Sequence, residues 1–160
     1  MEKHSHKDIE SLARLITAAD AVVVGAGSGL SSAAGFNHYH WTPALETYLE
    51  EFKDYYRFTS PFAGFYYCYS SPEQQWAYYT KYIYSMWHLP TGQPYLDLKA
   101  VLAGKDYFVL TTNVDMQCER VFPGERVCSY QGNMGYFQCS QPCHDQLYEN
   151  RELIEIMNQS

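Results

Sequence analysis

Apolar positions recur along this chain with two spacings, one typical of amphipathic helices and one of buried strands. Residues 5–20 predict a helix, because their apolar positions recur every three or four residues. These positions are Ile9, Leu12, Leu15, Ile16 and Ala19. The continuous apolar run at 21–25 (AVVVG) then predicts a strand buried on both faces.

The same spacings predict the remaining elements. Helices are expected within 44–52, 72–88, 93–105 and 150–160, and strands within 107–113 and 125–132. In the helix at 72–88, a helical face is predicted from Trp76, Tyr79, Ile83 and Trp87. No strand is expected between Trp41 and Lys105.

This order predicts an α/β fold, because strands that alternate with helices form parallel sheets. We expect a partial Rossmann-like sheet of about three strands in a single domain, residues 1–160. A small aromatic-rich helical lobe, residues 41–90, is inserted between the first and second strands. Aromatic residues, 17% of the chain, concentrate between 55 and 87. They form either the packed core of this lobe or a binding wall for a ligand or partner.

Composition excludes several classes of protein. The 160 residues are 46% apolar and 18% charged, as in a globular domain. The net charge is −7, with scattered Lys and Arg, which argues against a nucleic-acid partner. No apolar run approaches the roughly 20 residues that span a bilayer. The five cysteines form an odd set and no signal peptide is recognisable, so we expect reduced thiols and a cytoplasmic location.

A glycine-rich segment follows the first predicted strand. Gly25, Gly27 and Gly29 would let the backbone approach a phosphate at the carboxyl end of the sheet. Leu30 stands where the dehydrogenase fingerprint has its third glycine, and the acidic residue expected about 20 positions later is missing. These differences argue against hydride transfer. A tight strand-to-helix turn without a ligand is the alternative interpretation.

Polar residues also follow the other two predicted strands. Asn113 and Asp115, in LTTNVD, come directly after the second strand, and Gln131-Gly132 follows the third. Side chains at these strand ends would share a crevice with the glycine segment. The alternative for LTTNVD is an Asx turn that caps the next helix.

Together these motifs resemble the sirtuin family. Residues 27–35 (GSGLSSAAG) are similar to its glycine loop, and residues 111–115 (TTNVD) to its T-Q-N-I-D motif. Gln131-Gly132 stands at the family's catalytic His-Gly, and Cys139 and Cys143 stand at its first cysteine pair. An amide cannot act as the general base that the histidine provides in deacetylating members. With Asn37-His38-Tyr39-His40 in place of Pro-Asp-Phe-Arg, the chain looks most similar to class M sirtuins, which are linked to macrodomain proteins.

The resemblance implies NAD-dependent protein ADP-ribosylation, with a lipoyl-carrier protein as a candidate acceptor. It assigns catalysis to Asn113 and Gln131 and gives Tyr39 the aromatic position of the nicotinamide-ribose pocket. The cofactor-binding residues that it implies are Gly27, Ser28, Gly29, Ser31, Tyr39, Asn113, Asp115 and Gln131. Two alternatives stay open. One is an NAD-dependent deacylase, and the other is an inactive nucleotide-binding or protein-interaction remnant.

The resemblance also implies a zinc ribbon and a longer sheet. A ribbon needs four thiolates, whereas Cys139 and Cys143 form one pair here, with His144 as a third candidate ligand. We therefore expect no stable zinc. No later strands of the family's sheet are recognisable, so the sequence looks truncated after the first cysteine pair. Residues 21–25 would then form an exposed edge, through which we expect a homodimer.

Overall fold

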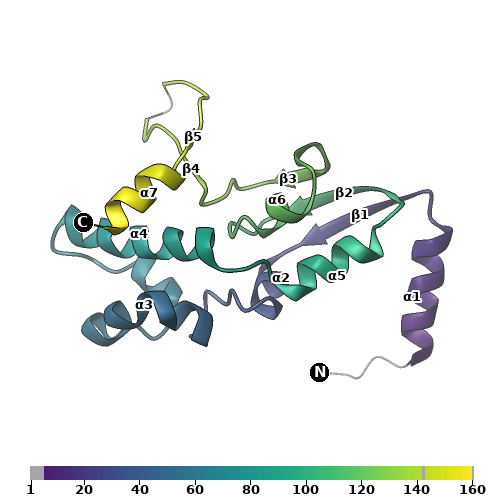
Figure 1. Ribbon diagram of the computed structural model, residues 1–160, viewed down its shortest axis with the longest axis horizontal. Helices are drawn as coiled ribbons and strands as arrows, with labels where there is room; N and C mark the ends of the chain where they lie inside the picture. The colour runs from purple at the N-terminus through teal and green to yellow at the C-terminus, as the bar shows by residue number, and fades with distance from the viewer. Residues whose placement is uncertain (1–5, 142, 160) are drawn as a thin grey trace.

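Three parallel strands form the larger of the two sheets in the described part of the chain. The structure, a computed structural model, describes residues 6–141 and 143–159. Strand β1 (Ala21–Ala26) pairs with β2 (Asp106–Thr111), and β2 pairs with β3 (Val127–Ser129), in the order β1-β2-β3 (Figure 1). The predicted α/β fold with a three-stranded parallel sheet is therefore confirmed, and β1 lies at an edge of this sheet.

One face of the sheet carries a hydrophobic core. Helices α2 (Ser28–Ala33), α5 (Gln93–Val101) and α6 (Gln117–Val121) contribute side chains to it. Its buried members are Tyr95, Leu102, Val109, Cys118, Val121 and Phe122. Within the described residues the opposite face stays accessible, since Val23, Phe108 and Leu110 are 70%, 38% and 43% exposed. The prediction that the first strand is buried on both faces was wrong, because β1 is covered on one face and alternates in exposure.

The helical lobe consists of α3 (Pro43–Tyr56), the 3-10 helix η1 (Pro61–Phe65) and α4 (Pro72–His88). Thr42 and Ser71 cap α3 and α4 by accepting hydrogen bonds from backbone N–H groups of the first turn, and a proline begins each helix. The buried core of the lobe contains Phe36, Leu45, Leu49, Phe58, Tyr78, Tyr82, Met86 and Met116. Helix α7 (Arg151–Asn158) packs on α4. The aromatic residues between 55 and 87 thus form much of this core.

Helix α4 has the predicted bounds, but Ile83 is the one member of its predicted face that is buried. Trp76 is 39% exposed, whereas Tyr78, Tyr82 and Met86 are fully buried. The helix packs against α3 on one side and α7 on another, so its apolar positions do not form a single face.

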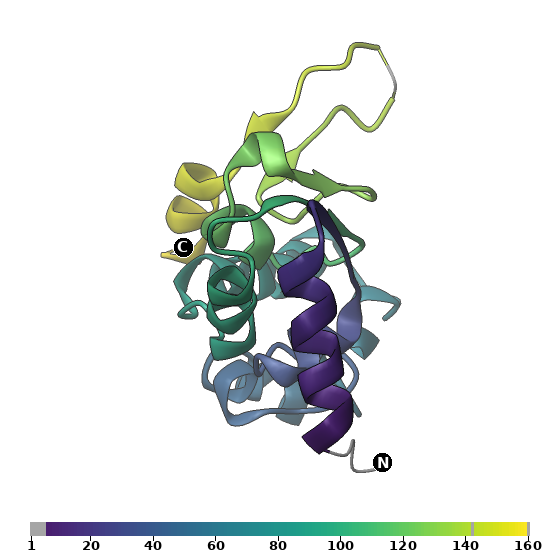
Figure 2. The same cartoon turned by 90° about the vertical axis from the view of Figure 1, so that its right-hand side faces the viewer.

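Helix α1 (His6–Ala18) stands apart from both cores. Figure 2 shows it in front of the other elements, joined to them at its C-terminal end. There the Lys105 ammonium donates hydrogen bonds to the carbonyls of Thr17 and Ala19. None of its residues is buried, and Ile9, Leu12 and Leu15 of its predicted apolar face are exposed, whereas Ile16 is partly buried.

Besides η1, the sequence did not predict the short elements η2 (Gly124–Arg126), β4 (Tyr136–Phe137) and β5 (Tyr148–Glu149). The last two pair antiparallel and lead the chain into α7. In the part of the chain that the structure describes, no helix is both long and apolar enough to cross a bilayer.

Candidate active site

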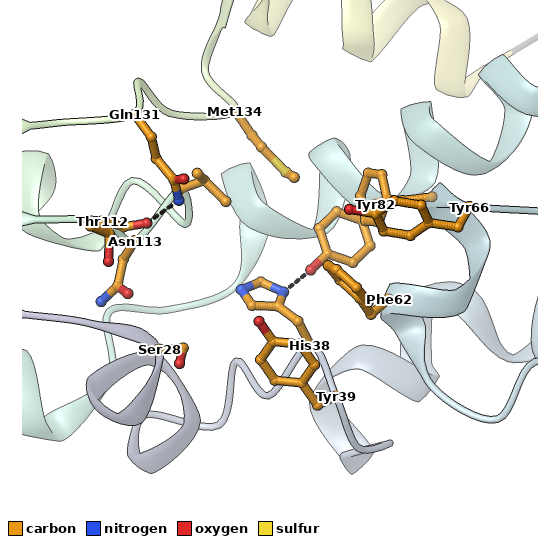
Figure 3. Close-up of a pocket in the computed structure, with 12 residues that line it drawn as sticks. Ser28, His38, Tyr39, Phe62, Tyr66, Tyr82, Thr112, Asn113, Gln131 and Met134 are labelled. Carbon is orange, nitrogen blue, oxygen red and sulfur yellow. Dashed lines mark hydrogen bonds between the residues drawn. The ribbon is translucent and has the colours of Figure 1, made fainter.

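A cavity of about 420 Å³ lies where the carboxyl ends of the strands face the helical lobe (Figure 3). This volume falls within the roughly 300–1,000 Å³ of small-molecule sites. Its lining is Ser28, His38, Tyr39, Phe62, Phe65, Tyr66, Tyr82, Thr112, Asn113, Val114, Gln131 and Met134. Four residues that the sequence predicted for the site, Ser28, Tyr39, Asn113 and Gln131, are therefore brought together.

The glycine segment passes from β1 into α2 at one side of the cavity. Gly27 is the extended N-cap residue of α2, and Ser28 lines the cavity. A Cβ atom added at Gly29 would meet no described heavy atom within 4 Å. Neither Gly27 nor Gly29 has a positive φ, so backbone conformation does not require glycine at these two positions. The open space beside Gly29 leaves room for a ligand close to the backbone.

Ser31 lies behind the cavity wall, where it is 1% exposed. Its hydroxyl is 3.3 Å from the Tyr95 hydroxyl. Its predicted contact with the cofactor stays a prediction, and in this structure its contact is with a buried tyrosine.

The end of β2 presents Asn113 to the cavity. The backbone N–H of Asn113 donates to Thr111 Oγ1 at 3.0 Å, and its Nδ2 donates to Tyr95 Oη at 3.1 Å. The Tyr95 hydroxyl in turn donates to Asp115 Oδ2 at 2.9 Å. Because that bond uses its one proton, Ser31 must be the donor in the bond to Tyr95. Asn113 is thus held by its nitrogen, and its amide oxygen is left for other partners.

Asp115 is 1% exposed and does not line the cavity. Besides Tyr95, it accepts a bond from the backbone N–H of Gln117 at 3.1 Å, which is the Asx turn considered for this segment. Burial, and next the charge of Asp115, raise the pKa of Tyr95, so the phenol keeps the proton that this bond needs. The alternative interpretation of LTTNVD therefore holds for Asp115, whereas Asn113 faces the cavity.

Gln131 reaches the cavity from the turn after β3. The turn is closed by the Gly132 N–H, which donates to the Ser129 carbonyl at 2.9 Å, and Gly132 has a φ of +75° that favours glycine. The Gln131 side-chain nitrogen donates to the Thr112 carbonyl (Figure 3). The amide is therefore oriented by the end of the neighbouring strand.

The loop 37–40 closes the cavity on the lobe side. Asn37 Oδ1 accepts bonds from the backbone N–H groups of Tyr39 and His40, at 3.0 and 3.1 Å, and fixes the loop as an Asx turn. The carbonyl of His38 accepts a bond from the Phe62 N–H at 2.8 Å. Tyr39 and His38 thus enter the cavity, while His40 does not line it.

His38 is a cavity residue that the sequence did not assign to the site. Its Nδ1 is hydrogen-bonded to the hydroxyl of Tyr82, which is fully buried in α4. Burial lowers the pKa of His38 below its ordinary 6.5, and the charge of Asp115 opposes this shift in part. The imidazole is therefore neutral at neutral pH. The one sequence signal for a role of His38 in the site was its position within residues 37–40, which stand in place of the family's Pro-Asp-Phe-Arg.

Aromatic rings form the outer wall of the cavity. Tyr39 packs on Phe62 with ring centroids 5.1 Å apart, and Phe62 packs on Tyr66 at 4.9 Å. The interpretation of the aromatic segment as a packed lobe core is confirmed for its buried rings, and the binding wall stays a prediction, for which the rings that line this cavity are the candidates.

A separate thiol cluster lies in the segment that joins β4 to β5. The Sγ atoms of Cys139 and Cys143 are 3.1 Å apart, and ligand atoms of Cys139, Cys143 and His144 all lie within 4.8 Å of one another. The hydrogen bond from Cys143 lowers the pKa of Cys139. Three ligands are one fewer than a structural zinc site requires, and the expectation of no stable zinc stays a prediction.

Comparison with known proteins gives two relatives that bear on this site. The chain is 35% identical over 156 residues to a protein ADP-ribosyltransferase of Staphylococcus aureus, a match that covers 94% of this chain and 48% of that protein. It is 33% identical over 140 residues to a probable bifunctional ADP-ribose hydrolase/ADP-ribosyltransferase of Fusarium oxysporum f. sp. cubense, covering 83% of this chain and 23% of that protein. No protein-family model matches the chain.

The chain is therefore related in sequence to ADP-ribosyltransferases. It spans about half of the bacterial relative and about a quarter of the fungal one.

Proposed function

We propose that this chain is an NAD-dependent protein ADP-ribosyltransferase of the class M sirtuin type. The observation that carries the proposal is the convergence of Ser28, Asn113 and Gln131 on one cavity, from the ends of three neighbouring strands. The relationship to proteins named as ADP-ribosyltransferases supports it independently.

The cavity has groups suited to the nicotinamide-ribose part of NAD. The Asn113 amide oxygen and the Gln131 amide can bond to ribose hydroxyls or a carboxamide, and Tyr39 offers an aromatic face to the nicotinamide ring. The space beside Gly29 would let the pyrophosphate approach the backbone at the start of α2.

The reaction breaks the bond between ribose C1′ and nicotinamide through an oxocarbenium-like state. Catalysis then depends on holding the ribose in place and on excluding water. Gln131, anchored on the Thr112 carbonyl, would orient the reacting ribose, and the wall of Tyr39, Phe62 and Tyr66 would exclude water. The acceptor is a side chain of another protein, and a lipoyl-carrier protein is the candidate that we propose.

The test is transfer of label from adenosine-labelled NAD to a carrier protein, with and without its lipoyl group. We expect label on the carrier with the unaltered chain, and a loss of at least tenfold with Asn113→Ala or Gln131→Ala. Gln138→Ala is the matched control, because Gln138 is an exposed glutamine outside the cavity lining.

Three other outcomes would contradict the proposal. Release of acetate or another acyl group from an acyl-lysine peptide, without label transfer, would identify a deacylase. NAD binding in calorimetry without transfer to any acceptor would identify a binding remnant. A lack of NAD binding would exclude both the transferase and the deacylase.

A further inference from the structure

We propose that His38 is the proton acceptor of the transfer step and that the acceptor side chain is therefore a nucleophile with a proton to lose. This inference rests on the proposed function and adds to it a catalytic residue and a class of acceptor.

The position of His38 supports this role. Its Nδ1 is engaged by the Tyr82 hydroxyl, and Figure 3 shows the other ring nitrogen directed away from Tyr82, toward the side of the cavity where Asn113 lies. The backbone on both sides of His38 is fixed by Asn37 and Phe62, so the ring is held in place rather than free at the surface. Asn113 and Gln131, the proposed ribose ligands, line the same cavity.

Among the side chains that line the cavity, His38 is the one whose chemistry allows it to accept a proton near neutral pH. The lining described above otherwise offers amides, hydroxyls, phenols and apolar groups, with no carboxylate, amine or thiol among them. Amides cannot take a proton, and hydroxyls and phenols hold theirs near neutral pH. Asp115, the carboxylate whose charge acts on His38, lies outside the lining and is bonded to Tyr95 and to the backbone of Gln117.

The protonation state of His38 agrees with the role of a base. Burial lowers its pKa, so the neutral imidazole with one free lone pair is present at pH 7. The proposal requires the tautomer in which Nδ1–H donates to the Tyr82 oxygen, because only that tautomer leaves a lone pair on Nε2, the ring nitrogen directed away from Tyr82. Tyr82 is hydrogen-bonded to the ring, Tyr39 and Tyr66 are the other titratable groups that line the same cavity, and the charge of Asp115 acts on the ring.

The step balances without a further reactant. A bond forms between the acceptor atom and ribose C1′, while the bond from C1′ to nicotinamide breaks and its electron pair neutralises the pyridinium nitrogen. The acceptor's proton passes to His38 Nε2 and then to water. Hydroxyl, thiol, amine and guanidine side chains meet this description, whereas an ionised carboxylate has no proton to give and would not need the base.

The experiment compares His38→Gln with the unaltered chain in single-turnover transfer over pH 5–9, with NAD affinity measured on the same samples. Glutamine keeps a hydrogen-bonding group but cannot accept a proton. We expect the transfer rate at pH 7 to fall about 100- to 10,000-fold, a range typical of lost general-base catalysis. The NAD affinity should change less than threefold. His40→Gln is the control, because His40 is an exposed neighbour in the same loop and does not line the cavity.

A second measurement does not depend on the folding of a variant. The transfer rate of the unaltered chain should fall on the acid side with the same pKa that NMR titration gives for the His38 ring, below 6.5. The role of His38 would be overturned if these two pKa values differ, or if His38→Gln transfers label as fast as the unaltered chain. Either result would leave the proposed function standing. Transfer to aspartate or glutamate would overturn the acceptor class. Failure of the unaltered chain to transfer at all would overturn the proposed function itself.

Discussion

Individual polar side chains in the cavity are each oriented by a partner that is fixed elsewhere in the fold. Tyr95 in α5 holds Asn113, the end of β2 holds Gln131, and Tyr82 in α4 holds His38. Such support lowers the entropic cost of arranging reacting groups. It also means that conservative changes outside the cavity should alter the function of the cavity.

Tyr95→Phe tests this support. The change leaves the buried Asp115 and Asn113 each without one hydrogen-bond partner, so we expect the free energy of unfolding to fall by about 1–3 kcal/mol. NAD affinity should weaken as well, because the Asn113 amide is no longer oriented. Urea unfolding and calorimetry measure the two effects. Tyr130→Phe, at an 82% exposed tyrosine, is the control, and equal results for both variants would contradict this role of Tyr95.

His38 should also make stability depend on pH. Its pKa is lower in the folded than in the unfolded chain, so the unfolded state takes up the proton first as the pH falls. Above about pH 6.5 the neutral His38 ring makes its full contribution to the free energy of unfolding. Below that pH the contribution is lost, with a slope of at most about 1.4 kcal/mol per pH unit. Unfolding experiments at pH 7.5 and 5.5 should therefore show a larger loss for the unaltered chain than for His38→Gln. An equal loss for the two would show that His38 is not desolvated.

The sequence predicted the part of the site that follows the strand ends. Ser28, Asn113 and Gln131 could be placed together because parallel strands end at a common edge. Tyr95 and His38 could not be placed in the same way. Tyr95 lies within a helix, where an aromatic residue is usually core, and its partners are 18 to 64 residues away in the chain.

Secondary-structure elements were predicted best where one spacing dominates. The apolar runs predicted the three parallel strands, and the helical spacing of apolar residues predicted the bounds of α4. Of the buried positions of α4, the prediction included Ile83 and missed Tyr78, Tyr82 and Met86, because the helix contacts elements on more than one side. The strands β4 and β5 have two residues each, too few for an alternating pattern to be recognised.

Packing between η1 and α4 can be tested at Gly64. A Cβ atom at this position would overlap the ring of Tyr78, which is fully buried. We expect Gly64→Ala to lower the free energy of unfolding by about 1–3 kcal/mol, as overpacked core positions do. Gly124→Ala is the control, since a Cβ there meets no described atom within 4 Å and φ is not positive. If both variants unfold at the same urea concentration, the lobe must accommodate the methyl group by moving η1.

The chain as a whole presents two apolar surfaces that its described residues leave open. One is the sheet face with Val23, Phe108 and Leu110, and the other is the stripe of Ile9, Leu12 and Leu15 on α1. Parallel sheets are normally covered on both faces. The two-residue link and the Lys105 contacts hold α1 at the end of the sheet, so the stripe does not cover the open face of its own chain.

We expect a second copy of the chain to associate at this side. Strand β1 is an edge strand beside the open face, and two β1 strands related by a twofold axis can pair antiparallel and join the two open faces into one surface. Sedimentation at micromolar concentration should show a dimer. Val23→Lys, which places a charge on the open face of β1, should shift it toward monomer at least tenfold in dissociation constant. Val101→Lys, at a 51% exposed valine on α5, should leave the dimer unchanged. A monomer of the unaltered chain under these conditions would show that these surfaces do not bind a second copy.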